Sequence, residues 1–390
     1  MNNNLATWPY FEEDERQVVQ KVLSSGKVNY WTGSECREFE KEFAEHCNVK
    51  YAVAVFNGTV ALELALYAFG VGNGDEVIVT SRTFIASASC CVMRGAIPIV
   101  ADVDAESQNI TAKAIASKIT AKTKAIICVH LAGWPCDMDA IMELAKQHNL
   151  YVIEDCAQAH GAKYKGKPVG SMGHASAYSF CQDKIMTTGG EGGMFLTNNE
   201  NVWKKAWAFK DHGKSYDAVY NKEHELGFRW LHESFGTNWR MTEMQAAIGR
   251  CQLKKLAVWT AKRRQYASMF NEAFKEIDAL RITIPNDDYF HAYYKYYLFI
   301  RPEKLADNWN RDRIMQEINS RGIPCFSGSC SEIYLEKAFD LPCYRPEKRL
   351  PVAKELGETS LMLLVHPTLT TKNIENAIDI VKGIMKIASK

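Results

Sequence analysis

The first two thirds of the chain alternate short apolar runs with amphipathic stretches. Apolar runs with the length of strands occupy residues 51–56, 76–80, 97–101, 125–130 and 151–153. Between them, apolar residues recur at helical spacing over 60–69, 85–94, 112–119 and 138–148. This alternation predicts a mostly parallel sheet with helices on both faces, because each parallel connection needs a crossover. The runs are almost continuously apolar, as expected where both faces of a strand are buried.

In the last third of the chain, strand-like and helical patterns follow each other in a different order. Residues 241–256 have a helical pattern that continues over 258–274 and leads into a region of mixed elements. Strand-like runs and helical patterns alternate there without the earlier regularity, at 293–300, 311–321, 361–365 and 374–388. A chain of 390 residues also exceeds the usual size of one domain. We therefore expect a large domain over residues 1–256 and a smaller one over 257–390.

Composition narrows the class of protein. Hydrophobic residues make up 47% and charged residues 24%, with a formal net charge of +1, so charge does not favour nucleic acid or a membrane surface as a partner. No apolar run approaches the ~18 residues that span a bilayer. The first residues have no basic region followed by an apolar core, so we expect no signal peptide. The twelve cysteines form no Cys-x-x-Cys pair, which favours reduced thiols and a cytoplasmic location.

Two carboxylates and a lysine are the first candidates for chemistry. The run 152–155 ends in Glu154 and Asp155, and the carboxyl ends of parallel strands are where ligands bind. Further along, Ser179 and Lys184 precede a glycine-dense turn at 189–193. A site for pyridoxal 5'-phosphate (PLP) needs such a set. The acid pairs with the protonated ring nitrogen, the serine binds the phosphate and the lysine amine condenses with the aldehyde. Glu154 competes with Asp155 for the first role.

A second phosphate contact is expected at Asn57-Gly58-Thr59, where a strand turns into a helix. Backbone amides at a helix N-terminus bind phosphate, Gly58 allows close approach and Thr59 adds a hydroxyl. The alternative is an ordinary turn in which Thr59 is the N-cap of the helix.

Several motifs in a fixed order resemble those of one family. The chain resembles, from about Tyr30 to Thr370, the DegT/DnrJ/EryC1/StrS sugar aminotransferases of the PLP fold-type I superfamily. The matching segments are 57–62, 74–79, 129–133, 154–160, the region around Lys184, and 238–245. The resemblance implies an aspartate aminotransferase-like α/β fold. It has a large domain with a mostly parallel seven-stranded sheet and a smaller α+β C-terminal domain.

The resemblance also assigns roles to single residues. Lys184 and Asp155 are the implied catalytic residues, and the family register favours Asp155 over Glu154. Gln158 is expected at the phenolic oxygen of the cofactor ring, and Phe84 is expected to stack on the ring. Asn238 matches an asparagine that reaches the phosphate of the neighbouring subunit, which implies a homodimer with shared active sites. The implied cofactor contacts are Gly58, Thr59, Phe84, Asp155, Gln158, Ser179, Lys184 and Asn238.

The substrate pocket is where the chain departs from its relatives. Many relatives carry a His-Tyr-x-Pro-Leu-His-like loop after the Gly-Ile turn of the small domain, whereas residues 322–334 here are rich in small hydroxyls. The default substrate is a nucleotide-linked 4-keto-6-deoxy sugar. An oxidised 3-deoxy-manno-octulosonate, giving its 8-amino sugar, is the alternative, and its acid group would need a cation. The candidate substrate-binding residues are Arg229, His232, Lys295 and Ser329.

The expected reaction is the transfer of an amino group from L-glutamate to a keto or aldehyde sugar for cell-surface polysaccharide or lipopolysaccharide. No metal is expected. Some relatives carry histidine in place of the lysine and are sugar dehydratases, and Lys184 argues against that activity. A non-catalytic regulatory protein is the other alternative, and the presence of Asp155, Gln158, Ser179 and Lys184 together argues against it.

Overall fold

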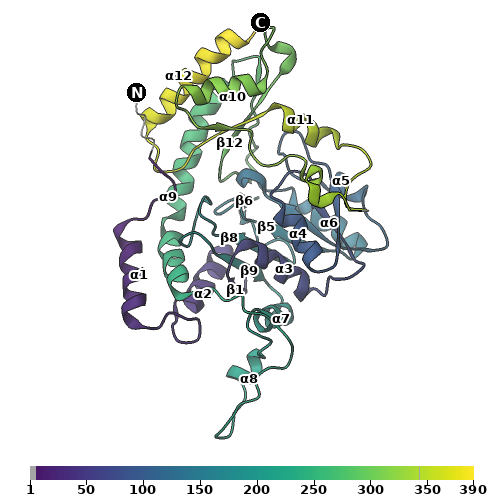
Figure 1. The fold of residues 1–390 in the computed structure, drawn as a ribbon, viewed down its shortest axis with the longest axis vertical. Coiled ribbons are helices and arrows are strands. Elements are labelled where there is room, and N and C mark those ends of the chain that lie inside the picture. Colours follow the sequence, from purple (N-terminus) through teal and green to yellow (C-terminus); the bar gives the residue numbers. More distant parts are fainter. Residues whose placement is uncertain (1–5, 342) are drawn as a thin grey trace.

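The computed structural model describes residues 6–341 and 343–390 (Figure 1). Its largest feature is a seven-stranded sheet in the order β1-β9-β8-β5-β4-β2-β3. Neighbouring strands are parallel from β8 to β3, and β9 is antiparallel to both β8 and β1. The strands are β1 (Tyr51–Val55), β2 (Glu76–Thr80), β3 (Ile97–Ala101), β4 (Thr123–Val129), β5 (Tyr151–Asp155), β8 (Ala175–Ser179) and β9 (Gly193–Thr197). The predicted mostly parallel sheet is confirmed.

Helices cover both faces of this sheet. Alternate residues of β4 enter different cores, with Ile127 on one face and Ile126 on the other, as the two-residue period of a strand requires. The first core includes α2 (Glu35–Cys47), α3 (Gly58–Ala68), α4 (Ala86–Met93) and α7 (Glu200–Lys210). The second lies under α5 (Ala112–Ala116) and α6 (Met138–His148). A small sheet of β6 (Lys163–Tyr164), β7 (Lys167–Pro168) and β11 (Tyr289–Phe290) lies beside it.

The C-terminal region forms a second, antiparallel sheet in the order β10-β12-β14-β13. It packs around its own apolar core with α10, α12 and the C-terminal part of α9 (Glu243–Phe274). The elements are β10 (Leu280–Arg281), β12 (Tyr296–Ile300), α10 (Arg311–Ser320), β13 (Cys325–Phe326), α11 (Pro351–Thr359), β14 (Ser360–Leu363) and α12 (Thr371–Ala388). This agrees with the expected smaller α+β unit.

One long helix connects the two regions. α9 (Glu243–Phe274) runs without a break through the expected division at residues 256 and 257. Leu256 packs in the core of the large sheet, and Tyr266 packs in the core of the small one. The division at 256 stays a prediction, with the change of core lying inside α9. α1 (Glu13–Ser25) lies alongside α9 (Figure 1).

A segment between α7 and α9 projects from the body of the molecule. It begins near α8 (Tyr216–Tyr220) and extends away from both sheets (Figure 1). We call residues 213–237 the arm. Within the described residues, no helix is long and apolar enough to cross a membrane.

Candidate active site

Asp155 lies at the carboxyl end of β5, in the middle of the large sheet. Its Oδ2 accepts a hydrogen bond from Ser87 Oγ at 2.9 Å, and its Oδ1 accepts one from the amide of Ala157 at 3.1 Å. Burial raises the pKa of Asp155, against the opposing hydrogen bonds of Ala157 and Ser87. Within the described residues, neither oxygen meets a cationic side chain. A ligand cation placed here would therefore stabilise the charged carboxylate.

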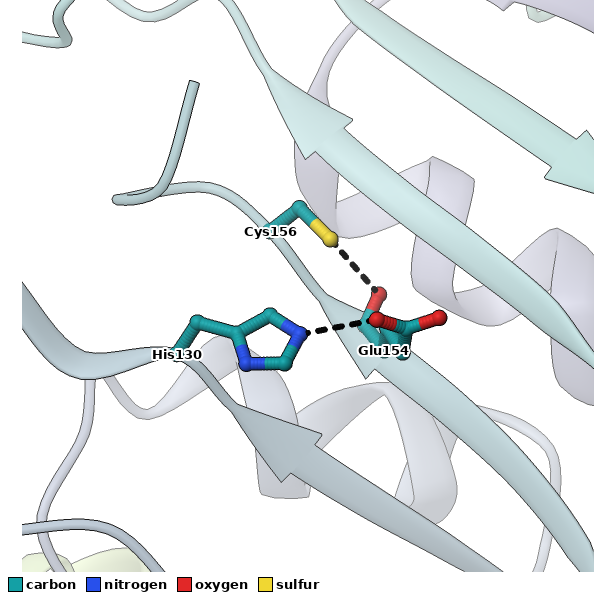
Figure 2. A group of neighbouring side chains, drawn as sticks. All are labelled: His130, Glu154 and Cys156. Carbon is teal, nitrogen blue, oxygen red and sulfur yellow. Dashed lines mark hydrogen bonds and ion pairs between the residues drawn. The ribbon is translucent and has the colours of Figure 1, made fainter. Parts of the chain in front are cut away.

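Glu154 cannot take the same role, because its side chain is already fully engaged elsewhere. Successive residues of a strand face opposite sides, and Glu154 accepts hydrogen bonds from the backbone amides of Gly170, Met172 and Gly173. His130 Nε2 donates to Glu154 Oε2 at 3.0 Å (Figure 2). Burial would raise the pKa of Glu154, but His130 and these amides lower it below its ordinary value. Cys156 Sγ donates to the main-chain carbonyl of Glu154 at 3.8 Å, so hydrogen bonds join all three residues of this cluster (Figure 2).

A cradle for a phosphate forms where α3 begins beside the end of β8. Asn57 is the N-cap of α3, since its side chain accepts from the amide of Val60 at 3.0 Å; the alternative that placed Thr59 in this role was wrong. A Cβ on Gly58 would lie 2.5 Å from the Cβ of Ser179. Only glycine therefore fits this approach. The helix N-terminus and the hydroxyls of Thr59 and Ser179 line one cavity of about 420 Å³.

Lys184 lies in the turn after β8 and faces the same cavity. Its side chain is 16% exposed, and its Nζ is 3.7 Å from Asp183 Oδ1. The ring of Tyr294 lies below the amine, with its centroid 5.1 Å away, and the Tyr294 hydroxyl donates to Asp183. The amine thus has one carboxylate neighbour and an aromatic surface, in a largely desolvated position.

Gln158 and Phe84 both line the smaller cavity. Gln158 Oε1 accepts from the amide of Ala132 at 2.8 Å, and among the described residues Nε2 has no partner, so that it can donate to a ligand oxygen in the cavity. Phe84 is 68% exposed and lines the cavity wall. A large aromatic ring left open to a cavity suits stacking on a flat ligand.

A second, larger cavity of about 840 Å³ adjoins the first. The two share Thr83, Phe84, Gln158, Asp183 and Lys184. Lys295 and Ser329, two predicted substrate residues, line the larger cavity. Burial lowers the pKa of Lys295 to about 8, with Arg263 and Lys184 acting in the same direction and Asp183 opposing them.

The structure does not bring Arg229 and His232 to the cavities of their own chain. Both are exposed on the arm, together with a series of large apolar side chains: Leu226, Phe228, Trp230 and Phe235. Asn238 is also exposed, at the base of the arm, where its backbone forms an isolated antiparallel β-bridge with that of Asp211. These three predicted residues cannot serve the cavity beside their own Lys184 in this arrangement.

Several lining residues escaped the sequence analysis. Ser87 follows Phe84 by one helical turn and holds Asp155, and its spacing from Phe84 was the only available signal. Asp183 is next to the predicted lysine, but no sequence pattern pointed to it as a residue of the site. Tyr294 and Tyr297 come from the small domain, and Tyr297 Oη accepts from the amide of Ser329 at 2.8 Å. Unlike Ser87 and Asp183, both belong to the aromatic-basic run 291–297, which the sequence marks either as the lining of a sugar pocket or as an amphipathic segment that packs its aromatic rings.

These residues fit PLP. An unpaired buried carboxylate suits the ring nitrogen, a glycine-lined helix start with two hydroxyls suits the phosphate, and a desolvated lysine suits the aldehyde. The fold and this site define a fold-type I PLP-dependent enzyme.

Comparisons with known proteins agree with this class. The family model of the DegT/DnrJ/EryC1/StrS aminotransferase family matches residues 9–382, and the chain belongs to that family. GDP-perosamine synthase of Escherichia coli O157:H7 is 37% identical, with 94% of each chain covered. dTDP-3-amino-3,6-dideoxy-alpha-D-galactopyranose transaminase of Aneurinibacillus thermoaerophilus is 32% identical, with 95% of each covered. A crystal structure of an aminotransferase from Psychrobacter cryohalolentis has 59% identity and a TM-score of 0.97, covering 98% of this chain and 99% of that one.

The protein is accordingly a PLP-dependent sugar aminotransferase. The predicted family, fold class, cofactor and type of enzyme are confirmed.

Proposed function

We propose that the enzyme transfers an amino group from L-glutamate to a nucleotide-linked 4-keto-6-deoxy sugar used for cell-surface polysaccharide or lipopolysaccharide. The observation that carries this proposal is the size of the larger cavity. At about 840 Å³ it is near the upper end of the ~300–1,000 Å³ of ligand pockets and exceeds what a single sugar ring needs. The names of the two curated relatives, which refer to GDP- and dTDP-sugars, support the same class of substrate.

The proposed roles follow from the contacts of each residue. When bound, the cofactor supplies an electron sink for the charge that develops on the carbon losing its proton. Lys184 Nζ takes the proton from the α-carbon of the amino donor and, in the second half-reaction, delivers a proton to the sugar carbon. The Asp155 carboxylate keeps the ring nitrogen protonated. Ser87 and Ala157 fix that carboxylate in place.

Other residues bind and orient the cofactor. The start of α3, with Thr59 and Ser179, holds the phosphate, and Gln158 Nε2 donates to the phenolic oxygen. Phe84 covers one side of the ring. The enclosing side chains of Tyr294 and Tyr297 limit access of water to Lys184.

The arm supports a homodimer with shared active sites. Its four large apolar side chains are 77–106% exposed, which is unusual for a surface that stays in water. A second copy of the chain is the occupant that also explains Arg229, His232 and Asn238, since each would then serve the site of its partner. A cytoplasmic location agrees with the free state of all twelve cysteines.

Mixing two inactive variants tests the shared site. Lys184→Ala and Asn238→Ala chains together form a heterodimer in which one site carries both defects and the other carries neither. Random association then leaves about a quarter of all sites intact. Recovery of activity on mixing supports the proposal, and no recovery despite confirmed subunit exchange contradicts it.

Lys295 gives a specific reason to retain the acidic sugar as a second candidate. It is a largely buried lysine in the larger cavity, and within the described residues it has no ion pair or hydrogen bond to a side chain, only a contact with the ring of Tyr294 at 4.7 Å. Such a cation would match a carboxylate on the substrate.

Competition kinetics with both sugar classes and L-glutamate separate the candidates. Efficient turnover of the nucleotide-linked keto sugar, with no turnover of the octulosonate aldehyde, supports the first. Turnover of the octulosonate aldehyde alone, abolished by Lys295→Met, supports the second. Turnover of neither sugar refutes both.

A further inference from the structure

A contact between the start of the chain and the main chain of Lys184 lies outside the site described so far. The indole Nε1 of Trp8 donates a hydrogen bond to the carbonyl oxygen of Lys184 at 2.8 Å. The two residues are 176 positions apart. Among the described residues, Trp8 is the one side chain that bonds to this carbonyl.

The indole of Trp8 is held on several sides. Trp259 of α9 contacts its edge with ring centroids 5.1 Å apart, and His366 stacks on it at 6.2 Å. The guanidinium of Arg263 lies over the same ring at 5.1 Å from its centroid. Arg263 is buried, and burial lowers its pKa to about 9. This packing fixes the direction in which the Trp8 N–H points.

The neighbouring backbone is anchored on both sides of Trp8. Thr368 Oγ1 donates to the carbonyl of Thr7 at 3.0 Å. After the segment turns, Lys255 of α9 forms ion pairs with Glu12, Asp14 and Glu15 at 2.7–2.9 Å. Residues 6–12 are therefore a strap held against α9, and Trp8 within it bonds to the turn that carries Lys184.

That turn is also held by bonds of its own, since Lys184 N donates to the carbonyl of Cys181 at 3.1 Å and Gln182 N donates to that of Gly190 at 2.9 Å. Phe180 N donates to the carbonyl of Gly192 at 2.8 Å and closes its base. Gln252 Oε1 of α9 accepts from the amide of Thr187 at 2.9 Å and holds its far side. Trp8 is the side chain that bonds to the main chain of Lys184, from outside the turn. A lysine side chain has four rotatable bonds, so the position of its amine depends on how well its main chain is fixed.

We propose that Trp8 is a positioning residue of this aminotransferase. Its indole N–H fixes the main chain of Lys184 and thereby sets where the lysine amine meets cofactor and substrate. The strap is thus a working part of the active site, although no atom of it needs to touch either ligand. This inference rests on the proposed role of Lys184, which the Lys184→Ala variant tests on its own.

The test compares Trp8→Phe with Trp259→Phe. Both variants lose one indole from the same aromatic group, but only the first loses the donor to Lys184. We expect Trp8→Phe to lower kcat about tenfold, since small misplacements of a reacting group have such effects, with KM for both substrates changed less than twofold. The PLP dissociation constant, measured by titrating apo-protein and following fluorescence, should rise at least threefold. The apo-protein should unfold at a temperature close to that of Trp259→Phe.

The kcat and the PLP dissociation constant of these variants can either support or contradict the positioning role of Trp8. If Trp8→Phe and Trp259→Phe have the same kcat and the same PLP dissociation constant, the hydrogen bond does not position the lysine. Trp8→His, which keeps a ring N–H and loses most of the packing, should retain more activity than Trp8→Phe. A loss equal to that of Trp8→Phe, or greater, contradicts the proposal. Should Trp8→Phe fail to fold, Trp8→His measured against Trp259→Phe carries the same test. An inactive Lys184→Ala with unaffected Trp8 variants would refute this inference and leave the proposed function intact.

Discussion

Asp155→Asn should affect the apo-protein and the PLP-bound protein in opposite directions. The substitution is nearly isosteric, so Oδ1 can still accept from Ala157, and Ser87 can reorient its hydroxyl to donate to Thr83 or accept from the new amide. What disappears is a buried negative charge. Because burial raises the pKa of Asp155, the charged form costs folding free energy at neutral pH. The apo-variant should therefore be at least as stable as the wild type.

The bound protein loses an ion pair to the ring nitrogen of the cofactor. Removing one partner of a buried pair costs ~3–5 kcal/mol, mainly because the other charge is left unpaired. The ring nitrogen can release its proton instead of staying charged and unpaired, so the lower end of this energy range applies. A cost of about 3 kcal/mol corresponds to a PLP dissociation constant roughly 100-fold weaker, at ~1.4 kcal/mol per factor of ten. Turnover should fall further, since a neutral ring is a poorer electron sink.

Glu154→Gln is the matched control, one residue earlier in the same strand. It should leave PLP affinity within about threefold, because Glu154 faces away from the cavity. Its stability should fall by ~2–4 kcal/mol, since four donors lose a charged acceptor. The lowered pKa of Glu154 means that this stability is fully present above the ordinary pKa of a glutamate and is lost as pH falls through the lowered value. Urea unfolding of both apo-variants at pH 7 and pH 4 measures the difference.

Two results would refute this reasoning. One is a PLP dissociation constant of Asp155→Asn equal to that of the wild type, which would remove Asp155 from the cofactor. The other is a Glu154→Gln protein with weakened PLP affinity and unchanged stability, which would mean that the two carboxylates have exchanged roles.

The other predictions concern the lysine, the phosphate cradle and the larger cavity. Lys184→Ala should abolish turnover with an unchanged far-ultraviolet circular dichroism spectrum, and near-wild-type activity would reject the assignment. Gly58→Ala should weaken PLP binding at least tenfold and cost ~1–3 kcal/mol of stability, because its Cβ would overlap Ser179; Gly383→Ala, whose Cβ would meet only the end of Arg321 at 3.8 Å, is the control for stability. If Lys295 binds an anionic group of the substrate, KM should rise as pH increases through about 8, where the lysine loses its charge, and Lys295→Met should have a flat profile.

The parallel part of the sheet was predictable from the sequence because its strands are buried on both faces and therefore apolar throughout. The end of β5 shows the strength of that argument. Asp155 lies at a strand end, where the pattern placed it, and its separation from Glu154 follows from the alternation of side chains along a strand. The phosphate cradle at Gly58 followed from the same logic of a strand turning into a helix.

The strands that carry the serine and close the glycine turn were not predicted as strands. β8 reads Ala-Ser-Ala-Tyr-Ser, a run of small and polar residues with little strand preference, and tertiary burial decides its conformation. Lys295 was a candidate from the sequence, but the placement of Lys295, Tyr294 and Tyr297 around one cavity depends on how the domains meet. Trp8 is the extreme case, since no pattern connects the start of the chain with a turn near its middle.

α9 also constrains how the enzyme can move. With 32 residues it is about 48 Å long at ~1.5 Å per residue, and it holds Thr187 near one end and packs Phe274 into the small domain at the other. A continuous helix resists bending, so it acts as a rod shared by both domains and not as a hinge between them. Closure over a substrate must therefore leave the lysine turn and this rod fixed together. The loops around Phe326 and Cys330, which line the larger cavity, do not belong to this rod and are free of that constraint.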